Sequence, residues 1–344
     1  AGMMYDQYGD LRVIKRNYSA MKKWMDYMRT KYGKEGLITK DTYGDWCVPP
    51  ESPELIHSQD PARQTDGTLL STAYYIQLLK RMSQYATLTG HKQDVAGYDA
   101  LITSMSAAFE KKFFDSGKKI YGNGTQTSSV IPLAFDLVPP GDREALVANL
   151  TRKIESESNN HVGVGLVGAQ WLMRTLSDNG HADLAFTIAT QPTYPGWGYM
   201  VEKGATTVWE LWNGDTADPA MNSGNHVMQI GDLNVWLYEY LAGIRSDPAN
   251  PGFRHTIIKP YAVKGLNFVK ASHKSMYGTI VSAWKREGSS LTLAVTIPPN
   301  TTATVLLPSA SQPDTPDGAK FLRMDAGRAV FEVPSGSYSF TAGQ

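Results

Sequence analysis

The chain has 344 residues, a length that suits about two domains, and its 33 Lys and Arg residues balance 33 Asp and Glu residues. A net charge near zero argues against a nucleic-acid partner or an anionic membrane surface, because both attract proteins with a basic excess. The single cysteine, Cys47, excludes an intrachain disulfide and a cysteine-based zinc site, and no run of about 18 apolar residues predicts a membrane span.

The first two thirds of the chain have the pattern of paired helices. Apolar periodicity and cap-like residues predict helices within residues 2–9, 11–32, 66–90, 92–114, 125–138, 141–157, 166–191 and 224–244. The first residues already read as helix, without a Met start or a polar leader, so we expect the chain to begin inside a larger parent protein. Paired helices fit either an α-solenoid or a closed α/α toroid. Because no fixed repeat period is found and the loops are chemically distinctive, the toroid is favoured.

The pattern changes after a turn-rich segment at residues 246–253. Short runs with alternating hydrophobicity follow at residues 255–260, 267–272, 278–287, 290–298, 302–308, 329–334 and 337–342. They are separated by Gly, Pro, Asn and Ser. We therefore predict a mainly α chain with a β domain: a helical domain over residues 1–245, followed by an antiparallel β-sandwich over residues 246–344.

The most distinctive motif is "TTVWELWNGD", in which Glu210 lies between Trp209 and Trp212. A buried carboxylate without a partner is energetically costly, so its surroundings must supply a compensating interaction. One interpretation places Glu210 at the floor of an aromatic-walled pocket. The alternative is a buried aromatic cluster in which Glu210 forms a salt bridge.

Two further clusters are candidates for ligand binding. In "YGDW", Asp45 could bond a hydroxyl while Trp46 packs against a sugar face, or the loop could merely be anchored by Trp46 in the core. The motif "MNSGNHVMQIGD" brings His226 to the start of the last helix. There it could donate to a substrate hydroxyl or to Glu210, or it could be a solvated side chain in a capping cluster.

Other chemistries find little support. No convincing metal-ligand spacing, serine nucleophile elbow or phosphate-binding loop occurs, so we predict no metal site and no cofactor. The loops that carry Gln126 and His161 are interpreted as structural. A carboxylate among aromatics in a helical toroid points to glycoside hydrolysis. That reaction ordinarily uses two carboxyl groups, about 5–5.5 Å apart for retention or about 6.5–9.5 Å apart for inversion.

Several segments resemble one known family. Five segments are similar to the α-L-rhamnosidases of glycoside hydrolase family 78: "YPGWGYMVEKGATTVWELWNGD", "MNSGNHVMQIGDLNVWLYEYLAGI", "DQYGDLRVIKRNYSAMKKWMDYM", "YGDWCVPP" and residues 251–308. The resemblance implies an (α/α)6 barrel, a C-terminal β-sandwich and an inverting mechanism. It also implies that Glu210, in the family's A-T-T-[IV]-W-E motif, is the general base. His226 matches the histidine of the N-H motif, and Asp45 and Trp46 match the G-D-W loop.

The chain departs from the family pattern in two places. Leu211 stands where the family usually has a basic residue. The D-E-R-L-G-W-T-G-D-type segment, which carries the family's general acid and two substrate-binding aspartates, is not found. In the family it precedes the part that resembles residues 1–30. The resemblance therefore implies that the first helices of the barrel and the proton donor belong to an N-terminal part of the parent protein.

The leading hypothesis is the C-terminal portion of an inverting α-L-rhamnosidase, with a rhamnose-containing carbohydrate as substrate. Glu210 is then the general base. The predicted substrate-binding residues are Asp45, Trp46, Trp209, Trp212 and His226. Two alternatives stay open: a non-catalytic carbohydrate-binding protein that has lost the general acid, and a different toroid glycosidase such as an uronyl hydrolase.

Overall fold

The computed structural model describes residues 1–218 and 222–343, so Met221 of the predicted His226 cluster lies outside the described residues. The chain forms two compact units: one comprises Ala1–Lys15 and Asn234–Gln344, the other Arg16–Leu233. The division predicted at residue 245 stays a prediction; these units group residues 1–15 with the strands. No helix among the described residues is long and apolar enough to cross a membrane.

The unit Arg16–Leu233 is built from helices, as predicted. They are α2 (Arg12–Tyr32), α3 (Gly67–Thr89), α4 (Lys92–Phe113), α5 (Gln126–Ala134), α6 (Arg143–Arg152), α7 (Leu166–Asp178), α8 (Ala182–Ala189), α9 (Trp197–Glu202) and α10 (Val227–Trp236). The strands described in this unit form two short ribbons, β1 (Gly33–Lys34) with β2 (Leu37–Ile38), and β3 (Phe114–Asp115) with β4 (Ile120–Tyr121). Helix α9 was not predicted, because its six residues make fewer than two turns.

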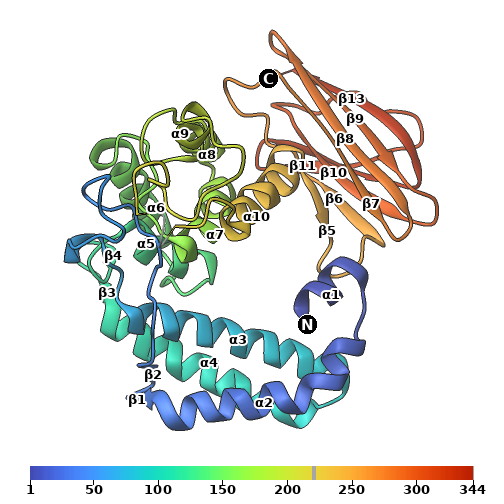
Figure 1. Cartoon of the computed structure of the whole chain (residues 1–344). Helices are drawn as coiled ribbons and strands as arrows, with labels where there is room; N and C mark the ends of the chain where they lie inside the picture. Colours follow the sequence, from blue (N-terminus) through green and yellow to red (C-terminus); the bar gives the residue numbers. More distant parts are fainter. Residues whose placement is uncertain (219–221, 344) are drawn as a thin grey trace. The chain divides into compact units, whose positions relative to one another are not determined.

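The helices pack as successive hairpins. α3 packs on α4, α5 on α6 and α7 on α8, and the hairpins contact one another through α3, α5 and α7 (Figure 1). This is the way hairpins are arranged in an α/α barrel. In a series of antiparallel hairpins, every first helix begins at the same end. The loops that precede α3, α5 and α7 therefore gather at one end of the unit, where Asp66 caps α3 and Thr125 caps α5.

The helix predicted over residues 141–157 is interrupted. α6 ends at Arg152, and the chain continues as a π-helical turn, η2, over Lys153–Glu157. Such turns insert one residue into the helix and are frequent at functional sites. Here the turn carries Lys153 and Glu157 toward the loop that precedes α7.

The other unit contains α1 (Gly2–Tyr8), the π-helical turn η4 (Leu237–Leu241) and two sheets. The first sheet has the order β11 (Lys320–Asp325), β12 (Arg328–Val333), β10 (Thr302–Pro308), β6 (His255–Ile258) and β5 (Ile244–Ser246). The second has the order β13 (Gly336–Gly343), β9 (Ser290–Ile297), β8 (Gly278–Glu287) and β7 (Phe268–Ser275). These strands are drawn in orange and red in Figure 1.

The two sheets enclose one apolar core, which confirms the predicted strand-rich domain. Phe331 of the first sheet and Trp284, Leu293 and Phe340 of the second are almost fully buried in it. One pairing differs from the antiparallel expectation: β6 and β10 run parallel. Strands β5 and β11 were not predicted. β11 is a mostly exposed edge strand with charged residues, so its sequence lacks the alternation that marks a half-buried strand.

Candidate active site

Glu210 lies in an irregular segment that pairs with the chain just before α10. The Glu210 amide donates to the Ser223 carbonyl oxygen over 2.9 Å, and the His226 amide donates to the Val208 carbonyl oxygen over 2.7 Å. These two bonds bring His226 into the immediate neighbourhood of Glu210.

Both carboxylate oxygens of Glu210 accept a hydrogen bond. The indole Nε1 of Trp46 donates to Oε1 over 3.3 Å, and the Ser223 amide donates to Oε2 over 3.1 Å. The side chain is half-buried. The alternative prediction, a salt bridge to Glu210, is not seen among the described residues. Two neutral donors fix the orientation of the carboxylate, and two donors leave lone pairs on its oxygens for a further ligand.

An apolar cluster supports Trp46. Cys47, Leu211 and Ala217 are buried together, and Trp46 packs against them. This cluster gives a physical reason for Leu211, because a basic side chain at that buried position would be desolvated. Burial also raises the pKa of the Cys47 thiol, so Cys47 stays protonated and contributes as a small apolar side chain.

Asp45 has a different role from the expected sugar contact. Its carboxylate is buried and accepts from the Thr127 hydroxyl, from the Gly165 amide over 2.8 Å, and from the Val167 and Gly168 amides over 2.9 and 3.0 Å. Burial raises the pKa of the Asp45 carboxyl, and these four donors act in the opposite direction. Four donors occupy both oxygens, so no lone pair is left for a sugar hydroxyl. Asp45 instead fastens the loop to the start of α7.

Of the two tryptophans beside Glu210, one faces the core. Trp212 is fully buried, its Nε1 donates to the Val164 carbonyl oxygen over 3.0 Å, and its ring packs edge to face on Trp197 at 5.0 Å. This geometry does not fit the predicted pocket wall and makes Trp212 a core residue. Trp209 is half-buried, and its ring lies against Gly214, where an added Cβ would come within 2.8 Å of ring atoms. Trp209 therefore remains a candidate for the wall of the pocket beside Glu210.

His226 is half-buried beside Glu210. Its ring nitrogen Nδ1 is buried and has no hydrogen-bond partner among the described residues. A buried ring nitrogen without a partner is unusual in a folded protein and indicates a position that a ligand or water can satisfy. The structure thus places His226 beside Glu210, where the sequence motif predicted it.

A cavity of about 320 Å³ adjoins Trp46. The Trp46 ring meets Tyr43 at 5.5 Å and His57 at 4.7 Å, both at steep angles, and all three residues line the cavity. Sequence reasoning missed His57, because a single exposed histidine in an irregular loop carries no pattern. Among the described residues, no group of three or more His, Cys, Asp or Glu side chains is arranged to hold a metal ion.

Known protein families match both parts of the chain. The family model described as the bacterial alpha-L-rhamnosidase 6 hairpin glycosidase domain matches residues 1–241. The model described as the bacterial alpha-L-rhamnosidase C-terminal domain matches residues 243–321.

Curated relatives and solved structures agree with these families. The alpha-L-rhamnosidase of Streptomyces avermitilis is 33% identical over 98% of the chain, and one from Formosa agariphila is 33% identical over 94%. The crystal structure of the Streptomyces avermitilis enzyme complexed with L-rhamnose superposes with a TM-score of 0.88 at 32% identity, covering 98% of this chain and 32% of that one. The alpha-L-rhamnosidase structure from Dictyoglumus thermophilum also gives 0.88, at 28% identity, covering 99% and 38%. The chain spans 32% and 34% of the length of the two curated relatives, about a third of each.

Proposed function

The chain belongs to the family of bacterial α-L-rhamnosidases, and from this premise we propose that the protein releases terminal α-L-rhamnose from carbohydrates or other glycosides by an inverting mechanism. One observation supports this most directly. The Glu210 carboxylate is held by an indole and a backbone amide that come from segments far apart in the sequence. Neither donor is charged, so the carboxylate is oriented without being neutralised by a cation.

In the proposed mechanism, Glu210 is the general base. It removes a proton from a water molecule while that water attacks the anomeric carbon from the face opposite the leaving group. Trp46 and Trp209 lie against the sugar ring, and the buried Nδ1 of His226 finds its partner in a sugar hydroxyl. Asp45 and Trp212 act indirectly, because they hold the loops that carry these groups.

An inverting reaction also needs a proton donor for the leaving oxygen. The family segment that carries this acid is not found in the 344 residues, and the chain is about a third as long as its curated relatives. We therefore assign the donor to another part of the parent protein. The 344-residue chain then supplies the base and part of the sugar pocket.

The experiment is hydrolysis of 4-nitrophenyl α-L-rhamnoside by the full-length parent protein, followed by proton NMR from the first turnover. Inversion predicts that β-L-rhamnose appears first and then mutarotates. Initial release of α-L-rhamnose would contradict the inverting mechanism and the role of Glu210 as base. Binding of rhamnose without any turnover would instead support the carbohydrate-binding alternative.

A further inference from the structure

A second cavity, of about 500 Å³, lies at the same end of the helices as Glu210. Its volume falls within the range of small-molecule sites, about 300–1,000 Å³. Val48 lines both this cavity and the smaller one beside Trp46. In the sequence, Val48 is only two residues away from Trp46. The proposed function uses the Trp46 side of this loop and leaves the larger cavity without a role.

The cavity has a rigid floor. Gln126 is almost completely buried: its Oε1 accepts from the Gly163 amide over 2.9 Å, and its Nε2 donates to the Ser158 hydroxyl and the His161 carbonyl oxygen, each over 3.2 Å. The prediction that Gln126 and His161 belong to structural loops fits these bonds. They fix the loop that precedes α7 and so give the cavity a defined shape without a ligand.

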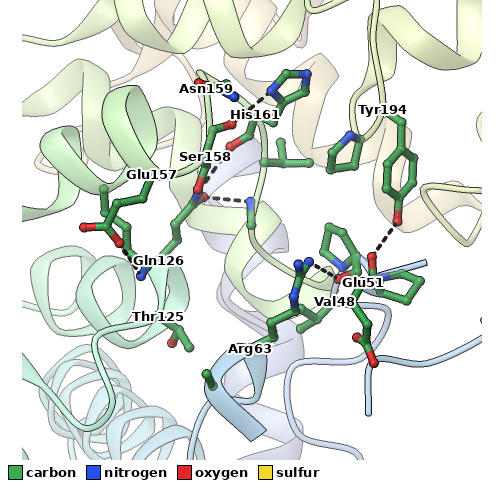
Figure 2. Close-up of a pocket in the computed structure, with 17 residues that line it drawn as sticks. Val48, Glu51, Arg63, Thr125, Gln126, Glu157, Ser158, Asn159, His161 and Tyr194 are labelled. Atoms are coloured by element: carbon green, nitrogen blue, oxygen red, sulfur yellow. Dashed lines mark hydrogen bonds and ion pairs between the residues drawn. The ribbon is translucent and has the colours of Figure 1, made fainter. Parts of the chain in front are cut away.

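The walls combine apolar rings with charged side chains. Figure 2 shows Tyr194 and Glu51 on one side and Glu157 and Gln126 on the other. Pro49, Pro50 and Pro195 add further apolar surface, and the Tyr194 hydroxyl donates to the Pro50 carbonyl oxygen over 3.3 Å. A sugar presents the same combination, with C–H groups on its faces and hydroxyls around its edge.

The charges of the cavity are balanced. The Nζ atom of Lys153 lies 3.1 Å from Oε2 of Glu157, and the hydrogen bond from Lys153 lowers the pKa of the Glu157 carboxyl. The hydrogen bond from Ser58 lowers the pKa of Glu51, and Arg63 supplies a second cation. Two carboxylates and two cations give no excess of either sign. Lys153 is paired with Glu157, and Arg63 Nε lies 3.7 Å from Oδ2 of Asp60, so both cations already have a carboxylate partner. An acidic sugar would bring a further negative charge, whereas an uncharged sugar can use donors and acceptors alike.

We propose that this cavity binds the part of the substrate to which rhamnose is attached, and that this part is an uncharged sugar. The inference rests on the proposed function, because it extends the substrate from the Glu210 site across the loop that contains Val48. A flat aromatic group is a poorer fit. It gains most from stacking between rings, and the described lining offers one tyrosine ring among charged side chains.

The chain contains a matched pair of variants for the test. Arg152 and Lys153 both pair with Glu157, over 2.7 and 3.1 Å, but only Lys153 lines the cavity. Lys153→Gln replaces a charged donor of the pocket by a neutral amide and removes one ion pair, whereas Arg152→Gln removes only an ion pair. Ala62→Trp is a second variant, because Ala62 lines the cavity and is exposed, so an indole there obstructs the cavity while leaving the ion pairs intact.

The first measurement is binding of methyl β-D-glucoside to the 344-residue chain by ligand-observed NMR, with glucuronate as the acidic comparison. We expect the unmodified chain and Arg152→Gln to bind the glucoside equally. In Lys153→Gln, which loses a charged hydrogen bond, the affinity should fall about tenfold, and in Ala62→Trp binding should be lost. No binding of the glucoside, tighter binding of glucuronate, or equal affinities in Lys153→Gln and Arg152→Gln would each overturn the proposal.

The second measurement uses the full-length parent protein and compares a rhamnosyl-glucose disaccharide with 4-nitrophenyl α-L-rhamnoside. The ratio of kcat/KM for the disaccharide to that for the aryl rhamnoside should fall about tenfold in Lys153→Gln and keep its value in Arg152→Gln. An unchanged ratio in Lys153→Gln would overturn the proposal. If neither substrate is hydrolysed, the proposed function fails, and the glucoside titration still decides whether the cavity binds an uncharged sugar.

Discussion

The indole Nε1 of Trp46 donates to Oε1 of Glu210 over 3.3 Å, although 164 positions separate the two residues in the sequence. The bond joins the loop that precedes α3 to the irregular segment that follows α9. Because each segment is fastened elsewhere, Trp46 by its apolar cluster and Glu210 by its pairing with Ser223, the carboxylate has a defined direction before any ligand arrives. Preorganisation of this kind is what a general base requires.

Replacing the proposed base is the most direct kinetic prediction. Glu210→Gln keeps the shape of the side chain and one oxygen that can accept from Trp46, but an amide does not remove a proton from water at neutral pH. In the full-length parent protein, kcat for an α-L-rhamnoside should fall by about 10²–10⁴, with little change in substrate binding. The control is Glu202→Gln, an exposed carboxylate on α9. Near-normal turnover by Glu210→Gln would remove Glu210 as the base.

Asp45 should matter chiefly for stability. Asp45→Asn leaves one acceptor oxygen where two now receive four donors, and it turns an NH2 group toward backbone amides. We expect the free energy of unfolding to fall by about 3 kcal/mol, since charged hydrogen bonds are lost in a buried place. The measurement is denaturant unfolding, with Asp41→Asn, an exposed residue of the same loop, as control. Equal stability of the two variants would contradict the anchoring role of Asp45.

Much of this architecture follows from local sequence pattern. Helices such as α3 and α4 can be predicted from their length, their apolar periodicity and their capping residues. The alternating hydrophobicity of β8 and β9 predicts half-buried strands. Short elements such as α9 carry too few residues for a period to show. The π-helical turn after α6 could not be predicted from the sequence either, because one inserted residue does not change the composition of a helix.

The sequence predicted which residues belong to the site better than it predicted how their side chains are oriented. The motifs placed Trp46, Glu210 and His226 together, and the structure brings them together. The direction of Trp212 depends on where Trp197 and Val164 lie in the fold, and local sequence does not contain that information. The same holds for Asp45, because an aspartate that binds a sugar and one that caps a helix have the same sequence signature.

Replacing Gly165 by a residue with a side chain should destabilise the protein, because two loops approach each other closely at this position. A Cβ on this residue would overlap the carbonyl oxygens of Trp46 and Asp45, and the neighbouring Leu166 amide donates to the Trp46 carbonyl oxygen over 2.7 Å. Gly165→Ala should therefore push the Trp46 loop away. We expect a loss of about 1–3 kcal/mol in the free energy of unfolding, together with a lower kcat.

The matched control for Gly165→Ala is Gly97→Ala in α4, where an added Cβ meets no atom within 4 Å. Alanine favours a helix more than glycine does, so this variant should be as stable as the parent or more stable. Thermal unfolding and turnover of both variants provide the readout. If Gly165→Ala matched Gly97→Ala in both measurements, the two loops would have to be less tightly joined than the structure shows.

The half-buried pair of Asp232 and Arg174 should make stability depend on pH. Burial raises the pKa of Asp232 to about 6, and Arg174, whose Nη2 lies 3.5 Å from Oδ1, offsets only part of that rise. In the unfolded chain the pKa is close to 3.8, so the folded state holds the proton more tightly. The resulting stabilisation is fully present below about pH 4 and is lost as pH rises through about 6.

Asp232→Asn tests this directly, because the amide does not titrate. A difference of about two pKa units corresponds to roughly 3 kcal/mol, and the 19% exposure of the Asp232 side chain places it mostly out of solvent. The free energy of unfolding of the unmodified chain should fall by up to that amount, relative to Asp232→Asn, between pH 4 and pH 7. Comparing the slopes of the two proteins isolates Asp232 from other titrating groups, and Asp99→Asn, an exposed carboxylate on α4, should keep the original slope. Parallel pH profiles for the unmodified chain and Asp232→Asn would show that Asp232 has an ordinary pKa in the folded protein.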